Sequence, residues 1–180
     1  MKFFIILAAA LALTISSEPL RIDFGQAKDG QDWQIIVDGV MGGLSQGSKE
    51  MKTNSLYFDG SVSLANNGGF SSCKAPFQAT DLSAYTKLLI RCKGEGQAFA
   101  ITLENDRRWF MPYYKMEFVP TADWQVMELP LADFDHYRIG QKIGKTPTAE
   151  DLAATLRLGI TTNSKKEGPF VLEVDYIEFR

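Results

Sequence analysis

The sequence predicts an all-β protein, and three observations support this prediction. Apolar and polar residues alternate along most segments after residue 20, no window of a dozen residues sustains a helical apolar stripe, and turn residues separate nearly all of the segments. About eleven strands with short antiparallel linkers favour a β-sandwich of jelly-roll type, with at most one or two short helical turns. A closed barrel is the second architecture that the pattern allows.

The candidate strands are runs of β-branched and aromatic residues bounded by turn signals. They cover residues 20–24, 33–37, 55–58, 61–65, 69–74, 87–93, 98–103, 109–119, 124–129, 156–162 and 170–179. Asp59-Gly60 is typical of a hairpin turn and is expected to join the third and fourth candidates. Segment 134–147 is the longest without clear periodicity, and we interpret it as a loop.

Alternation also predicts which side chains face the core. The inward rows are Phe99, Ile101 and Leu103; Leu156, Leu158 and Ile160; and Phe170, Leu172 and Val174. Three one-sided rows indicate stacked sheets. Because Ile177 and Phe179 lie on the opposite parity from Val174, we expect a bulge near residues 175–176.

One helical turn is predicted over residues 149–155. Thr148 is placed to accept a hydrogen bond as the N-cap, and Asp151 is placed to reach back to the cap. Pro147 stops the extended segment that precedes them.

The first 17 residues have the pattern of a secretory signal peptide, with Lys2, an apolar run over 3–13 and small residues before Glu18. Cleavage is expected near Ser16 or Ser17. The apolar run is shorter than the roughly 20 residues that span a bilayer, so a retained anchor is the weaker alternative. We therefore expect a secreted or periplasmic protein with one domain over residues 18–180 and no membrane insertion after cleavage.

Composition narrows the classes of partner. The chain of 180 residues carries a formal net charge of −3, and no basic run exceeds two residues, which argues against nucleic acid as a partner. Two cysteines and one histidine are too few ligands for a zinc site. Nothing indicates a structural calcium ion, so we expect no cofactor. Cys73 and Cys92 either form a disulfide or remain buried free thiols, and the sequence leaves both alternatives open.

Two glycine clusters, residues 38–45 and 66–70, flank candidate strands. Paired glycines next to Asp or Asn mark turns whose conformation is set locally. In a structural interpretation, the short polar side chains only bind nearby backbone. In a functional interpretation, Asp38, Ser45, Asn66 and Asn67 line a binding site formed by bare glycine backbone.

Aromatic residues offer a second candidate site. Trp109 and Tyr113 share one parity of a predicted strand, and Tyr114 has the other. Flat rings on a sheet face can stack on sugar rings while Arg91 or Arg107 supplies hydrogen bonds. The alternative is that each ring packs in the core.

Catalytic signals are weak. His136 is the single histidine and lacks a recognisable nucleophile elbow. Glu104, Asp106 and Glu117 could supply paired carboxylates, although surface charge is the default interpretation. We predict no catalytic residue and no enzyme, with a hydrolase as the alternative.

Several blocks of this chain resemble one known family. The most specific block is Trp33 followed by Val37-Asp38-Gly39-Val40-Met41-Gly42-Gly43-Leu44-Ser45. Residues 58–63, 66–72, 91–96, 129–134, 158–160 and 168–177, together with Trp124, fit the later pattern. These residues are similar to the complex I intermediate-associated protein 30 (CIA30) family, and the resemblance covers about residues 24–179.

The resemblance implies a galactose-binding-like jelly roll, related in shape to carbohydrate-binding modules. Eukaryotic members are similar to chaperones that help to assemble respiratory complex I in mitochondria, whereas the predicted export signal would send this chain elsewhere. The resemblance brings no catalytic residues. Our leading hypothesis is an exported, monomeric, non-enzymatic binding module that acts on a protein partner or assembling complex. The alternative is a carbohydrate-binding module.

Overall fold

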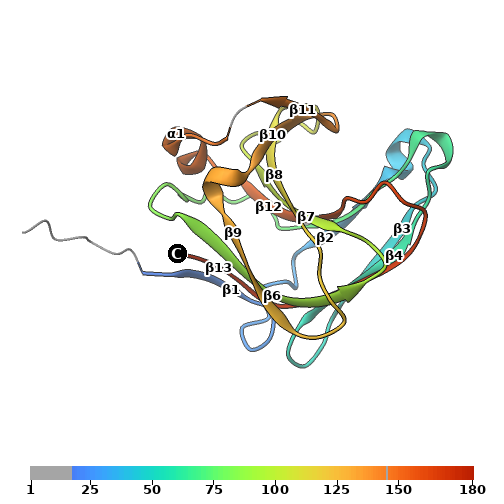
Figure 1. Ribbon diagram of the computed structural model, residues 1–180, viewed down its shortest axis with the longest axis horizontal. Helices are drawn as coiled ribbons and strands as arrows, with labels where there is room; N and C mark the ends of the chain where they lie inside the picture. The colour runs from blue at the N-terminus through green and yellow to red at the C-terminus, as the bar shows by residue number, and fades with distance from the viewer. Residues whose placement is uncertain (1–17, 145) are drawn as a thin grey trace, which may run out of the picture.

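Two antiparallel β-sheets pack on each other in the computed structural model, which describes residues 18–144 and 146–180 (Figure 1). Sheet A has the order β3 (Gln46–Met51), β4 (Leu56–Val62), β13 (Gly168–Phe179), β6 (Lys87–Glu95) and β9 (Gln125–Pro130), with β1 (Leu20–Asp23) also paired to β13. Sheet B has the order β11 (Gln141–Gly144), β10 (Asp135–Arg138), β8 (Tyr113–Phe118), β7 (Phe99–Glu104), β12 (Arg157–Thr162), β5 (Ser71–Lys74) and β2 (Gln34–Val37). The predicted all-β sandwich is therefore confirmed.

Short helical elements connect some of these strands. They are the α-helix α1 (Ala149–Ala153) and the 3-10 helices η1 (Asp38–Met41), η2 (Ala65–Asn67) and η3 (Leu131–Asp133). No helix in the described part of the chain is long and apolar enough to cross a membrane. The predicted signal peptide, residues 1–17, lies outside the described residues.

The core lies between the two sheets and is rich in aromatic rings. Phe99 of β7 lies near Phe58, Phe118 and Phe170, with ring centroids 6.4, 6.1 and 6.0 Å away. The three predicted inward rows are buried, except that Leu156 is half-buried. In Figure 1, β6 and β13 of sheet A cross the lower part of the molecule, and β7, β8 and β12 of sheet B lie above them.

Two local predictions are confirmed. The register of β13 against β6 shifts between Val174 and Tyr176, and the shift buries Ile177 and Phe179 on the opposite parity. Thr148 Oγ1 accepts a hydrogen bond from the Asp151 amide at 3.2 Å, and Asp151 Oδ2 accepts one from the Thr148 amide at 2.9 Å. This capping box begins α1.

The Asp59-Gly60 turn prediction is wrong, because both residues lie inside the continuous strand β4. A Cβ on Gly60 would lie 2.1 Å from the Gln46 carbonyl oxygen, so this glycine permits the close approach of β3. Strand β3 was not predicted, because its sequence is polar and has no alternating apolar residues.

The interpretation of segment 134–147 as a loop is also wrong. The segment contains the hairpin β10–β11, which pairs with β8 at the edge of sheet B. Strand β8 begins at Tyr113, so Trp109 lies in the connection before the strand rather than within it.

The structure decides between the two alternatives for the cysteines. Cys73 on β5 and Cys92 on β6 are both free and fully buried, on opposite sheets. Burial raises the pKa of each thiol to about 12. The two residues therefore act as small apolar groups in the core.

Candidate functional site

Asp38 lies at the start of η1 and is only 1% exposed. Its carboxylate accepts hydrogen bonds from the amide and hydroxyl of Ser45 at 3.1 and 2.6 Å, and from the amides of Gly69 and Phe70 at 2.6 and 3.2 Å. Burial by itself would raise the pKa of Asp38, but these hydrogen bonds outweigh it and hold the pKa below its usual value. The carboxylate thus joins the two glycine clusters.

The glycines of both clusters make room for this carboxylate. A Cβ on Gly43 would lie 2.3 Å from Asp38 Cγ, and a Cβ on Gly68 would lie 2.6 Å from Asp38 Oδ2. Asn66 is exposed, has a φ of 56°, and donates from Nδ2 to the Gly42 carbonyl at 2.9 Å. The geometry therefore favours the structural interpretation for Asp38 and Ser45. Asn66 and Asn67 remain accessible on the surface.

Arg91 lies on the outer face of sheet A, away from the glycine clusters. Its Nη1 donates to Asp175 Oδ2 at 2.6 Å, and its guanidinium carbon is 4.7 Å from the centroid of the Trp124 ring. Lys93, two residues further along β6, lies 5.1 Å from the same centroid. Trp124 thus lies against two cations, and each of them has a carboxylate partner.

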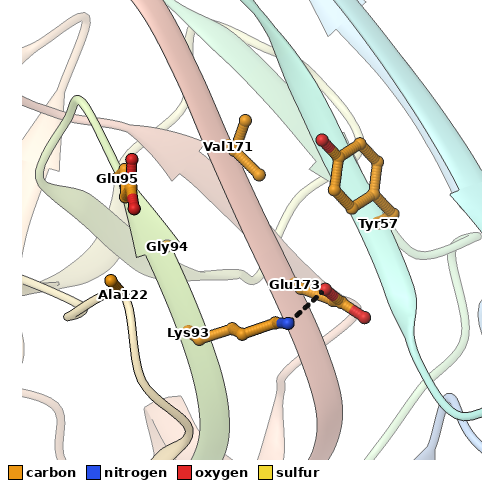
Figure 2. A pocket seen from close by; sticks show the side chains of 7 residues that line it. All are labelled: Tyr57, Lys93, Gly94, Glu95, Ala122, Val171 and Glu173. Atoms are coloured by element: carbon orange, nitrogen blue, oxygen red, sulfur yellow. Dashed lines mark ion pairs between the residues drawn. The ribbon is translucent and has the colours of Figure 1, made fainter.

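A shallow hollow of about 290 Å³ lies next to this cluster (Figure 2). Lys93 and Tyr57 come from neighbouring strands on either side of β13, which contributes Glu173. Lys93 Nζ lies 3.1 Å from Glu173 Oε2, and this ion pair is drawn across the hollow in Figure 2. The pair neutralises both of its charges, which leaves Glu95 as the other charged side chain that lines this hollow.

The outer face of sheet B brings together many more polar side chains. The strand registers align its outward residues in three rows across the sheet. The rows are Tyr137, Tyr113, Glu104 and Arg157; Asp135, Lys115, Thr102, Gly159 and Lys74; and Glu117, Ala100, Thr161 and Ser72. We call these residues, with Asn163 and Phe77, the polar face.

The middle of the polar face is sheltered although it points away from the core. Ala100, Thr102 and Glu104 of β7 are 0%, 3% and 9% exposed. Longer side chains from the neighbouring strands reach across this face, since Lys115 of β8 bonds to Asn163 after β12, and Lys74 and Arg157 bond to Glu104. Small residues thus lie beneath a cover of charged groups.

One charged network centres on Glu104. Lys74 Nζ lies 2.5 Å from its Oε1, and Arg157 Nη2 lies 2.5 Å from its Oε2. The Arg157 guanidinium stacks on Phe77 at 3.9 Å, and Arg107 lies 5.0 Å from the same ring. The network therefore holds two cations against one carboxylate, in a fixed arrangement.

A second network centres on Asn163. Lys115 Nζ donates to Asn163 Oδ1 at 2.7 Å, and Asn163 Nδ2 donates to Glu117. The Lys115 ammonium also lies 3.9 Å from the centroid of the Tyr137 ring. Burial lowers the pKa of Lys115.

Aromatic side chains border this face. Tyr113 and Tyr137 stack with their centroids 6.2 Å apart and their planes 25° apart. Trp109 is 69% exposed and packs edge-on against Phe110, whose carbonyl accepts from Arg138 Nε at 3.3 Å. Residues 105–112, which connect β7 to β8 and which we call the Trp109 loop, therefore lie beside the β10–β11 hairpin.

The candidate residues for catalysis contact other side chains of the protein. His136 stacks on the buried Tyr114 ring at 4.5 Å, which places Tyr114 on the core side of β8. Glu104 is paired with its two cations, and Asp106 binds Arg108 at 2.7 Å. In residues 18–144 and 146–180, no group of three or more His, Cys, Asp or Glu side chains could hold a metal ion.

The structure thus separates the candidates that the sequence grouped together. Tyr113 lies on the polar face, Trp109 in a loop near it, and Arg91 on the opposite sheet. Lys115 and Tyr137 carry no signal in the sequence that marks them as site residues. The residues of β7 that alternate with Phe99, Ile101 and Leu103 could have been predicted to point outward. Which residues of the neighbouring strands lie beside them depends on the strand registers.

The comparisons with known proteins agree with this geometry. The model of the family "Complex I intermediate-associated protein 30 (CIA30)" matches residues 22–174. Among solved structures, the chain is similar to a family 11 carbohydrate-binding module from Clostridium thermocellum in complex with a β-1,3-1,4-mixed-linked tetrasaccharide. That match has a TM-score of 0.63 and 14% identity, over 89% of this chain and 94% of that chain.

Two further matches show the same fold. The family 11 module of the Clostridium thermocellum cellulosomal cellulase Lic26A-Cel5E gives a TM-score of 0.62 and 13% identity, over 90% of this chain and 95% of that chain. An agarase gives 0.56 and 12% identity, over 90% of this chain but 24% of the agarase. Because the family model spans most of the sequence, the chain belongs to the complex I intermediate-associated protein 30 (CIA30) family.

Proposed function

We propose that this chain is a non-enzymatic binding module and that its polar face binds carbohydrate. The observation that carries the proposal is the hydrogen-bonded cover of this face, in which Glu104, Lys74, Arg157, Lys115 and Asn163 are held in place by one another. Such groups do not have to be ordered when a ligand binds, which lowers the entropic cost of binding.

The chemistry of the face suits a polyhydroxylated ligand. Sugar hydroxyls need both donors and acceptors, and the face presents ammonium, guanidinium, carboxylate and amide groups together. The stacked Tyr113 and Tyr137 add apolar ring surface at its border. The family 11 modules with the same fold support the proposal, since one of them was solved with a bound tetrasaccharide.

Affinity electrophoresis or calorimetry against a panel of soluble polysaccharides tests this function. The panel contains mixed-linked β-glucan, agarose oligosaccharides, xylan and polygalacturonate. The double variant Tyr113→Ala/Tyr137→Ala is expected to weaken binding at least about tenfold, by removing stacked ring surface.

The matched control is Tyr57→Ala/Tyr176→Ala, which removes two half-buried tyrosines from the outer face of sheet A. It should leave the affinity unchanged. Equal losses in both double variants would contradict the assignment of the site to sheet B. A wild-type protein that binds no polysaccharide would refute the proposed function.

A protein partner is the second candidate, and a different observation favours it. Trp109, Phe110, Ile139 and Ile143 are large exposed apolar residues in the Trp109 loop and the β10–β11 hairpin. Aromatic residues of this kind are enriched at protein interfaces. Co-purification from the exported fraction with wild-type protein and Trp109→Ala tests this candidate, and an unchanged set of specific partners would reject it.

We also propose that the chain is exported and acts as a monomer, as the first 17 residues predict for its location. Cell fractionation and the mass of the mature protein test the location, and light scattering tests the oligomeric state. A full-length protein retained in the cytoplasm would reject export.

A further inference from the structure

The charges of the polar face are unevenly distributed. Lys74 and Arg157 share the single carboxylate of Glu104. Arg107, at the border of the face, lies against the Phe77 ring. The polar face as defined holds three cations, Lys74, Lys115 and Arg157, and three acids, Glu104, Asp135 and Glu117. The local excess of positive charge is therefore confined to the surroundings of Glu104, where two cations share one carboxylate.

Lys115 differs from Lys74 and Arg157 because it does not contact a carboxylate directly. Among the described residues, no ion pair within 4 Å involves its ammonium group. The nearby acids already have partners, because Asp135 Oδ2 lies 2.7 Å from Lys142 Nζ and Glu117 accepts from Asn163. The half-buried ammonium group directly contacts an amide oxygen and a ring face, and it has lost part of its hydration. Glu117 and Asp135 act on it only from a longer distance.

A second polar group beside Lys115 is also unsatisfied. Thr102, its neighbour across the β8–β7 pair, is 3% exposed, and its hydroxyl has no hydrogen-bond partner among the described residues. The next residue in the row is Gly159, and a Cβ there would lie 2.7 Å from Thr102 Oγ1. An unpaired cation, an unpartnered hydroxyl and a bare backbone position are thus consecutive in one row.

We propose, resting on the glycan-binding function above, that the polar face selects sugars with an anionic group, either a uronate carboxylate or a sulfate ester, which binds Lys115 Nζ. The anion supplies a negative group in direct contact with the ammonium group, which the described residues do not provide. Thr102 and Gly159 are buried beside Lys115, so the sugar lies over the ammonium group rather than against these two residues. Lys74 and Arg157 contribute further positive potential to the same anion.

Three forms of one linear β-glucan test this inference: the neutral polymer, the same polymer oxidised at C6 to glucuronate, and the same polymer carrying sulfate esters. Wild-type protein is expected to bind one of the anionic forms at least about tenfold more tightly than the neutral form, as one charge-assisted hydrogen bond allows. The form that binds more tightly distinguishes carboxylate from sulfate. This preference should weaken as the salt concentration rises.

Lys115→Met nearly keeps the length of the side chain and should reduce the ratio of anionic to neutral affinity to about one. The ratio is the readout, because Lys115 belongs to the polar face and its loss also affects binding of the neutral form. The control is Lys93→Met, which alters a half-buried lysine that lies near a Trp ring and already has a carboxylate partner on sheet A. Urea denaturation establishes that both variants are folded.

The outcomes separate this inference from the function on which it rests. Equal wild-type affinity for the neutral and both anionic forms would overturn the inference and leave the glycan-binding function standing. The same would follow if Lys115→Met weakened neutral and anionic binding alike. A wild-type protein that bound no polysaccharide in either experiment would refute both.

Discussion

Replacing Asp38 by alanine removes one acceptor group from four hydrogen bonds at once. The amides of Ser45, Gly69 and Phe70 would remain in a sheltered region without their partner. At roughly 1 to 1.5 kcal/mol for each stranded amide, the expected loss in the free energy of unfolding is about 3 to 5 kcal/mol. This exceeds the effect of a typical surface substitution by several fold.

Urea denaturation followed by tryptophan fluorescence measures this loss. For a slope of about 2 kcal/mol per molar urea, the midpoint of Asp38→Ala should fall by roughly 2 M. Asp38→Asn keeps one acceptor oxygen and should lie between the variant and wild type, with a loss of about 2 kcal/mol. We call the four hydrogen bonds to the Asp38 carboxylate the clamp. A midpoint for Asp38→Ala within experimental error of wild type would show that the clamp does not stabilise the fold.

The glycines test the same clamp from the other side. Gly43→Ala places a Cβ 2.3 Å from Asp38 Cγ and should cost about 2 to 3 kcal/mol through displacement of the carboxylate. The matched control is Gly39→Ala in η1, whose new Cβ would meet nothing closer than 3.8 Å. It should change stability by less than about 0.5 kcal/mol. Similar losses in both variants would show that the loss of stability comes from reduced backbone flexibility and not from a clash with Asp38.

The pH dependence of the clamp has a defined sign. The folded-state pKa of Asp38 lies below its usual value of 3.8, so its contribution is fully present above that value and is lost as the pH falls through the folded-state pKa. The stability difference between wild type and Asp38→Asn should therefore be constant at neutral pH and narrow below about pH 4. A difference that widened on acidification would contradict this account.

Three further predictions concern the core and α1. Cys73 and Cys92 should resist thiol-specific reagents until the protein unfolds, since burial raises both pKa values to about 12. Rapid labelling of the native protein would contradict their burial, and a mass that indicates a disulfide would contradict the assignment of free thiols. Thr148→Ala should cost about 1 kcal/mol in urea denaturation by removing the cap of α1, and no change would show that the cap contributes little. Phe99→Ala should cost about 3 to 5 kcal/mol, whereas Val126→Ala, at a side chain that is 53% exposed, should stay within about 0.5 kcal/mol; comparable losses would dispute the position of the core.

Local features of the chain were predictable because their causes lie within a few residues. The Phe99 row follows from alternation in one strand, and the capping box at Thr148 spans three residues. The bulge after Val174 is visible as a change of parity. Asp59-Gly60 shows the limit of such reasoning, because the glycine is required by the approach of β3, a contact between separate strands.

Alternation and turn residues act over short distances, so the sandwich and most core residues could be predicted from the sequence, and the family likeness could be recognised in its motifs. The candidate site could not be predicted, because it is formed by contacts between segments that are far apart in the chain. Glu104 meets Lys74 and Arg157 from positions 30 and 53 residues away, and Lys115 meets Asn163 across 48 residues. These encounters depend on the registers of β8, β7, β12 and β5, which side-chain periodicity within one strand does not specify.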